Sequence, residues 1–227
     1  MALLEVKNLH TYFKTRKGIV KAVNDVSYAL EPGKTIGIVG ESGCGKSTLL
    51  QLVAGFLKPK SGIILNQACK ISYAFQEPRL FPWLTVTENL RAVLSDKDTA
   101  DSRIADALDT VSLSDAAHLY PDELSGGMKS RASLARALAY GGDLYLLDEP
   151  FAGVDPIAVI EIQRIIRFLK NRGIGVLITD HNVRETLGIC DHAYIICDGT
   201  VLASGHPKDI VQNEAVRRAY LGEAFRM

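Results

Sequence analysis

Residues 40–48 read Gly-Glu-Ser-Gly-Cys-Gly-Lys-Ser-Thr, and this segment limits the possible folds more than any other. A short apolar run at 36–39 precedes it and a helical pattern at 48–57 follows it. In a strand–loop–helix unit, such glycines let backbone N–H groups turn inward around a phosphate at the helix N-terminus. Lys46 can neutralise β- and γ-phosphate oxygens, and the Ser47 hydroxyl can ligate Mg²⁺. The sequence therefore predicts a nucleoside triphosphate loop formed by Gly40, Ser42, Gly43, Cys44, Gly45, Lys46, Ser47 and Thr48.

Short apolar runs rich in β-branched residues alternate with helical patterns along the chain, which favours a parallel sheet built from βαβ units. Nearly continuous apolar character is typical of strands covered on both faces. The central strand candidates are residues 36–39, 144–147, 175–179 and 193–197. Three further runs, at residues 3–9, 21–30 and 62–65, fit an antiparallel layer with one face exposed to solvent. We expect an α/β P-loop NTPase fold, with a mostly parallel central sheet flanked by helices and an N-terminal antiparallel β layer.

Residues 77–140 have a different pattern from the rest of the chain. Helical patterns at 85–94 and 102–113 are separated by a polar stretch, and no strand pattern interrupts the block. We expect a helical subdomain at 77–140, inserted into an ATP-binding core formed by residues 1–76 and 141–227. The whole chain would then be one nucleotide-binding domain.

Polar residues follow several of the predicted strands. Asp148 ends one strand and Glu149 comes next, so one carboxylate can serve Mg²⁺ while Glu149 orients or deprotonates an attacking water. His181 follows the strand at 175–179 and can hydrogen-bond the γ-phosphate. Gln76 ends a strand-like run and can contact both Mg²⁺ and the water. The expected catalytic residues are Lys46, Gln76, Glu149 and His181, and the expected metal-binding residues are Ser47, Gln76 and Asp148.

Ser125, Gly126 and Gly127 open a helical pattern at 128–139. They provide a second helix N-terminus, with exposed N–H groups and a hydroxyl suited to phosphate. If the two helix ends lie in different lobes, one chain cannot place both on the same γ-phosphate. We therefore expect a head-to-tail homodimer on ATP binding, in which residues 125–127 of each copy close over the nucleotide of the other. A capped helix start is the simpler interpretation of the same residues.

The order of these motifs, over essentially the whole chain, resembles the ATP-binding cassette (ABC) ATPases that drive membrane transporters. Residues 40–48 are similar to Walker A, 124–128 to the signature and 144–149 to Walker B. Gln76 matches the Q-loop and His181 the switch histidine. The resemblance implies ATP hydrolysis with Mg²⁺ and, where a cognate exists, transmembrane transporter subunits that dock near residues 76–91.

The same resemblance adds residues that the chemistry alone does not indicate. Residues 153–155 are similar to the D-loop, which implies that Asp155 lies at the nucleotide. An aromatic side chain is expected to stack on adenine; Phe13 is the better match and Tyr12 the alternative. The signature ends in Met128, where the family usually has Gln.

Three parts of the chain resemble different branches of the family. Residues 1–60 are similar to peptide importer ATPases and residues 75–86 to nitrate, sulfonate and taurine importer ATPases, whereas the chain from 146 onward resembles the lipopolysaccharide-export ATPase. The stretch between Lys46 and Gln76 is shorter than the family usually shows. These different resemblances along one chain favour a recombined or engineered chimera. The alternative is a divergent natural protein.

The charge balance argues against a nucleic-acid partner, because Lys plus Arg equals Asp plus Glu at 26 each. The four cysteines are scattered, which favours reduced thiols over a zinc site. No apolar run is long enough to span a membrane and no signal peptide is evident, so we expect a cytoplasmic protein, peripheral on the inner face of the cell membrane when bound to transporter subunits. Two alternatives are a nucleotide-binding module without significant ATPase activity and a cassette that acts on DNA or ribosomes.

Overall fold

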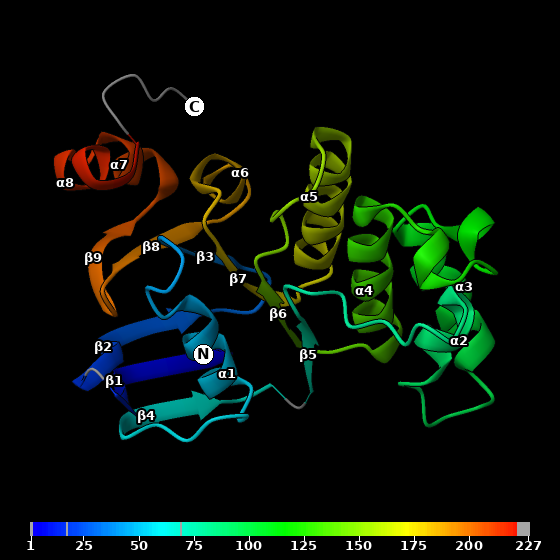
Figure 1. Ribbon diagram of the computed structural model, residues 1–227, viewed down its shortest axis with the longest axis horizontal. Coiled ribbons are helices and arrows are strands. Elements are labelled where there is room, and N and C mark those ends of the chain that lie inside the picture. The colour runs from blue at the N-terminus through cyan, green and yellow to red at the C-terminus, as the bar shows by residue number, and fades with distance from the viewer. Residues whose placement is uncertain (1, 17, 69, 222–227) are drawn as a thin grey trace.

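A six-stranded sheet forms the centre of the computed structural model, which describes residues 2–16, 18–68 and 70–221 (Figure 1). Its strands, in spatial order, are β5 (Ile71–Ala74), β6 (Leu144–Asp148), β7 (Gly175–Asp180), β3 (Thr35–Val39), β8 (His192–Cys197) and β9 (Thr200–Gly205). The first five are parallel to one another and β9 is antiparallel to β8. The predicted mostly parallel central sheet is confirmed.

The middle strands β3, β6 and β7 are buried at every residue, which explains their continuous apolar sequences. One face of the sheet is covered by α1 (Lys46–Val53) and by the antiparallel layer. The other face is covered by α4 (Gly126–Tyr140), α5 (Pro156–Asn171) and α6 (Val183–Leu187), as Figure 1 shows. All parallel strands therefore point their carboxyl ends toward one edge of a fully covered sheet.

The antiparallel layer has the strand order β2–β1–β4, with β1 at Leu4–Thr15, β2 at Gly18–Leu30 and β4 at Ser61–Asn66. Buried and exposed positions alternate along much of β1 and β2, because only one face of this sheet packs on the core. The predicted N-terminal antiparallel layer is confirmed.

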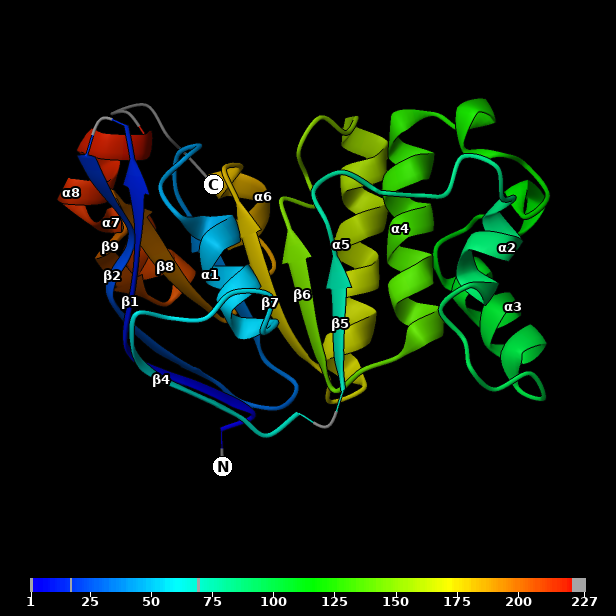
Figure 2. The ribbon, with the colours of Figure 1, turned by 60° about the horizontal axis from the view of Figure 1, so that its bottom comes forward.

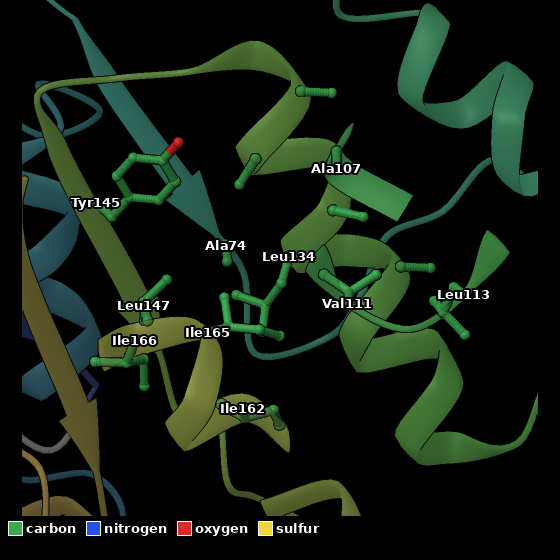
Figure 3. Packing of buried hydrophobic residues seen from close by; sticks show 14 of the residues in the cluster. Ala74, Ala107, Val111, Leu113, Leu134, Tyr145, Leu147, Ile162, Ile165 and Ile166 are labelled. Carbon is green, nitrogen blue, oxygen red and sulfur yellow. The ribbon is translucent and has the colours of Figure 1, made fainter. Parts of the chain in front are cut away.

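Residues 77–140 contain helices and turns and no strand. The helices are α2 (Val86–Arg91), α3 (Ala100–Thr110) and α4, with single 3₁₀ turns at Ser114–Ala116 and Pro121–Glu123. Their apolar residues share one core with α5 and the sheet; Leu134 of α4 and Ile165 of α5 lie next to each other in it (Figure 3). At the surface of this block Trp83 is 70% exposed, and its ring centroid lies 5.6 Å from that of Phe81.

Several helix limits differ from the sequence-based expectation. The helix expected at 48–57 is α1 and already ends at Val53, since the chain turns through Gly55 with φ +77°. The helix expected at 102–113 begins at Ala100 and ends at Thr110. The helix expected at 128–139 begins earlier, at Gly126.

The C-terminal part adds structure that the sequence did not indicate. After β9 come α7 (Pro207–Gln212), α8 (Glu214–Val216) and a turn at Arg217–Leu221. These short elements pack on β8 through Ile210 and Val216. No helix in the described part of the chain has the length and apolar character needed to cross a membrane.

Candidate nucleotide site

Two glycines in the loop between β3 and α1, Gly40 and Gly45, have no room for a side chain. A Cβ on Gly45, which has φ +104°, would lie 1.9 Å from the Ala22 carbonyl oxygen. A Cβ on Gly40 would lie 2.4 Å from the Ile196 carbonyl oxygen. These two glycines are thus required by close backbone packing behind the loop, in addition to any contact with phosphate.

Lys46 begins α1 and its amino group is enclosed by the loop. Its Nζ donates to the carbonyl oxygens of Gly40 at 2.8 Å and Glu41 at 2.9 Å, and it lies 3.4 Å from Oε1 of Glu149. The residue is 3% exposed. These oxygens compensate the buried ammonium charge.

Asp148 lies at the end of β6, among hydroxyl groups from three different elements. Its Oδ1 accepts from Ser47 at 2.9 Å and from Thr179 at 2.8 Å. Its Oδ2 accepts from the Tyr73 hydroxyl at 3.2 Å. Burial, and then the Asp148 charge, raise the pKa of Tyr73, so that its hydroxyl stays protonated and can donate.

The Ser47 and Asp148 pair fits Mg²⁺, which prefers oxygen ligands and usually keeps several waters. Gln76 contributes an amide to the same small cavity as Asp148 and Glu149. Across residues 2–16, 18–68 and 70–221, no group of three or more His, Cys, Asp or Glu side chains is placed to hold a metal ion. The donors available at this site are therefore a hydroxyl, a carboxylate and an amide.

Glu149 follows β6 and is 8% exposed. Its Oε2 lies 3.1 Å from Nε2 of Gln76 and 3.1 Å from Nδ1 of His181. When Glu149 is ionised, Nδ1 must be the protonated ring nitrogen. Together with Lys46, the four expected catalytic residues thus meet at the carboxyl ends of β5, β6 and β7 and the start of α1.

The backbone of Glu149 is in the left-handed region, with φ +47°, and its N–H donates to the Thr179 carbonyl at 2.7 Å. A non-glycine residue in this region is strained, and such strain concentrates at functional sites. The neighbouring β7 strand therefore holds the turn that aims the Glu149 carboxylate.

Two residues of β7 support the site and were not anticipated: Thr179, described above, and Asp180. Asp180 is fully buried and accepts from the backbone N–H groups of Phe151 at 2.9 Å and Asn182 at 2.8 Å. Burial raises the pKa of its carboxyl group. It joins the loop that carries Glu149 to the loop that carries His181. The strand-end argument that found Asp148 would also have found Asp180, the last residue of β7.

The segment 125–127 lies away from the loop at 40–48. The Ser125 hydroxyl accepts from the N–H of Met128 at 3.3 Å and caps α4. In the described part of the chain no hydrogen bond or ion pair joins these residues to the loop, and α4 lies on the far side of α5 and β6 from α1 (Figure 2). The capped helix start is therefore confirmed, and Ser125 and Gly126 are exposed whereas Gly127 is buried.

Asp155 caps α5 by accepting from the N–H groups of Ile157 and Ala158, both at 3.0 Å. A Cβ on Gly127 would lie 3.1 Å from Oδ2 of Asp155 and 2.8 Å from Cβ of Ala158. The starts of α4 and α5 are thus in contact, and the structure brings Asp155 to the 125–127 segment.

Of the two aromatic candidates, Phe13 is 40% exposed. The Tyr12 ring instead has the Lys60 ammonium 4.4 Å from its centroid, and its hydroxyl donates to Asn24 at 2.8 Å. Phe13 thus has the freer ring for stacking. Cys44 is buried, 4.0 Å from Nζ of Lys46, and burial raises the pKa of its thiol.

Two family models match the chain. The model described as ABC transporter matches residues 23–152, and the model described as branched-chain amino acid ATP-binding cassette transporter matches residues 196–226. The lipopolysaccharide export system ATP-binding protein LptB of Escherichia coli K12 is 42% identical, with 100% of each chain covered. Because one relative aligns with the whole length, the comparisons give no support to the chimera hypothesis.

Solved structures of dimeric cassettes have the same fold. The dimeric bacterial ABC transporter cassette MJ0796 superposes with a TM-score of 0.82 at 25% identity, covering 90% of this chain and 98% of that one. The dimeric post-hydrolysis state of the same cassette, bound to ADP and Pi, gives a TM-score of 0.81 at 25% identity with the same coverage.

Proposed function

The chain belongs to the ATP-binding cassette transporter ATPases, and from this premise we propose how its residues work. It binds ATP with Mg²⁺, hydrolyses the ATP, forms a homodimer and powers a transporter through transmembrane subunits. The observation that carries the assignment of roles is the contact set of Glu149, which Gln76, His181 and Lys46 hold beside the Ser47–Asp148 pair.

In this proposal the loop amides and Lys46 bind the β- and γ-phosphates. Ser47 and Asp148 would hold Mg²⁺, which would neutralise charge on the phosphate oxygens. Glu149 orients a water and accepts a proton from it, and the water oxygen attacks the γ-phosphorus. The bond from that phosphorus to the bridging oxygen of ADP breaks, so ATP and water give ADP and phosphate. Gln76 and His181 hold the Glu149 carboxylate in line for this attack.

Residues 125–127 of the second copy complete the site, since in their own chain they do not reach the phosphate loop. The α4 N-terminus supplies N–H groups and the Ser125 hydroxyl to the γ-phosphate across the dimer. Asp155 touches this segment in its own chain and comes to the same seam, and Phe13 stacks on the adenine. The arrangement would bind two nucleotides between two subunits.

We also propose residues 77–140 as the helical subdomain and residues 1–76 with 141–227 as the ATP-binding core. The exposed Phe81 and Trp83 side chains give the subdomain an apolar surface. A helix of a transmembrane subunit would cover this surface, which places the protein on the inner face of the cell membrane during transport.

Phosphate release by the purified chain, compared with Lys46→Ala, tests the proposed hydrolysis. We expect the parent to release phosphate from Mg-ATP and Lys46→Ala to lose at least about a hundredfold in rate, because charge stabilisation carries most of this catalysis. Binding of ATP with no release above the Lys46→Ala background would instead make the protein a binding module.

Gel filtration of Glu149→Gln tests the shared site. This variant keeps the shape of residue 149 but cannot accept the proton, so it should retain ATP and elute as a dimer with ATP and Mg²⁺. It should elute as a smaller species without nucleotide. A monomer at saturating Mg-ATP would contradict the proposed completion of the site by a second copy.

A further inference from the structure

The C-terminal turn is tied to the central sheet by one tyrosine. Tyr220 lies in the turn at Arg217–Leu221, and its hydroxyl donates to the Ile196 carbonyl oxygen at 2.8 Å. The β8–β9 register is irregular between Ile195 and Ile196, so the pairing is interrupted at this point and the carbonyl can take a partner from outside the sheet. Tyr220 itself is half-buried.

The Ile196 carbonyl forms part of the wall behind the phosphate loop. A Cβ on Gly40 would lie 2.4 Å from this oxygen and 2.6 Å from Sγ of Cys44. The turn after β8 also holds the loop directly, because the N–H of Gly199 donates to the Cys44 carbonyl at 3.1 Å. The position of the Ile196 carbonyl therefore limits how far back Gly40 can move, and Gly199 holds Cys44.

Apolar packing also links the C-terminal elements to the strand that precedes the phosphate loop. Val39, which immediately precedes Gly40, is fully buried in one cluster with Ile210 of α7 and Val216 of α8. The Tyr220 ring packs against this cluster. The C-terminal elements thus contact both the strand that enters the phosphate loop and the carbonyl behind it.

The surroundings of the Tyr220 hydroxyl keep it in the donor form. Burial raises the pKa of this phenol, the neighbouring Cys197 thiol raises it further, and a hydrogen bond from the Glu41 backbone lowers it in part. The hydroxyl is therefore protonated at neutral pH.

We infer that Tyr220 is a positioning residue for nucleotide binding, whose hydroxyl fixes the back of the phosphate loop through the Ile196 carbonyl. It contacts no phosphate ligand itself, and it acts by holding the Ile196 carbonyl in place against Gly40. The inference rests on the nucleotide site proposed above. It extends that site to a C-terminal segment that carries none of its motifs.

Tyr220→Phe tests this inference, because it removes the hydroxyl and keeps the ring in the apolar cluster. The matched control is Tyr140→Phe, at the end of α4, where the ring packs under the Lys70 ammonium at 3.9 Å and lies away from the loop. Loss of one neutral hydrogen bond should raise the KM for Mg-ATP about threefold to tenfold in Tyr220→Phe. The kcat at saturating ATP should stay within about a factor of two of the parent, and Tyr140→Phe should match the parent in both constants.

Amide hydrogen exchange without nucleotide gives a readout that does not need activity. Exchange at residues 40–47 should quicken in Tyr220→Phe, while exchange in β6 stays as in the parent. An unchanged KM with unchanged exchange at 40–47 would overturn the inference, as would an increase spread evenly through β6. A parent that fails to bind ATP while the exchange result holds would instead count against the proposed function.

Discussion

Single residues in the phosphate loop are restricted by the backbone behind them. The carbonyl of Ala22, on the irregular part of β2, fills the space that a side chain at Gly45 would need. The amino group of Lys46 occupies the other side of the loop. The loop is thus held between the Ala22 carbonyl and the Lys46 amino group.

Gly45→Ala should therefore abolish measurable Mg-ATP binding, because the new methyl group would lie 1.9 Å from a backbone oxygen that cannot rotate away. Gly55→Ala is the matched control: φ is +77° there and the space around it is open, so only conformational strain of about 1–2 kcal/mol is expected. Titration with a fluorescent ATP analogue measures both variants. Equal affinity in Gly45→Ala and the parent would show that the loop can relax.

Among single residues, the sequence predicted the polar site residues that follow strands. It did not predict the residues that contact them. Gln76, Glu149 and His181 come from three strand ends that do converge, because parallel strands share one carboxyl edge. Tyr73 and Thr179 lie within strands, where alternation gives no sign of which hydroxyl points at Asp148. The contact of Tyr220 could not be predicted from the sequence, because its partner is a backbone carbonyl at an irregularity in the pairing of β8 with β9.

Among the elements, the segment before α2 depends on one buried side chain. Asn89 is fully buried; its Oδ1 accepts from the N–H of Phe81 at 2.7 Å, and its Nδ2 donates to three carbonyls. The carbonyls belong to Phe81, Leu84 and Thr85, at 3.0–3.1 Å. Asn89 thus shapes the turn that presents Trp83 at the surface.

Asn89→Ala should destabilise the protein by about 2–4 kcal/mol, because it leaves several buried backbone groups without partners. A fall of roughly 5–15 °C in Tm follows for a chain of this size. The control is Asn66→Ala, which removes a single exposed hydrogen bond to the N–H of Ala68. Differential scanning calorimetry distinguishes them, and similar Tm values for the two variants would contradict the role given to Asn89.

Strand β8 carries a titratable group whose state affects stability. Burial, and then the proximity of His206, lower the pKa of His192 below its ordinary value of 6.5. When the pKa of a group is lower in the folded state than in the unfolded state, its contribution to stability is complete above the unfolded-state pKa. That contribution is lost as the pH falls through the folded-state pKa. Unfolding free energy should therefore fall as the pH drops below 6.5.

His192→Gln should flatten that dependence, because a neutral amide binds no proton on unfolding. Urea unfolding followed by circular dichroism between about pH 5 and 8 measures the slope for both proteins. The two curves should run parallel near pH 8 and diverge on acidification. A variant as sensitive to acid as the parent would show that other groups control the slope.

Element prediction succeeded where the apolar pattern was clear, as for the buried strands β3, β6 and β7. It failed at β9, α7 and α8, which have six, six and three residues. These elements are too short for a period to develop, and packing against β8 rather than local preference decides their structure.

The two large hydrophobic cores of the molecule share the central sheet, because successive side chains of a strand point to opposite faces of the sheet. Tyr145 and Leu147 of β6 pack in the core that contains α4 and α5, whereas Leu144 and Leu146 of the same strand pack in the core that contains α1 and the antiparallel layer. The helical insertion packs on one face of β6, and α1 with the antiparallel layer packs on the other.

We expect one cooperative unfolding transition, because neither core can lose its share of β6 without exposing the other. Far-UV circular dichroism, which reports the helices, and near-UV signals from the buried tyrosines should give the same midpoint in urea. An early loss of helical signal with the tyrosine signal intact would show that residues 77–140 unfold on their own.

The exposure of Trp83 gives this protein a built-in optical reporter. It is the only tryptophan in the sequence, and its indole is surrounded mostly by water. Any protein surface that covers Phe81 and Trp83 would replace that water and shift the emission toward the blue. Association with a candidate membrane subunit can therefore be followed on the unlabelled chain, free of background from other indoles in the same polypeptide.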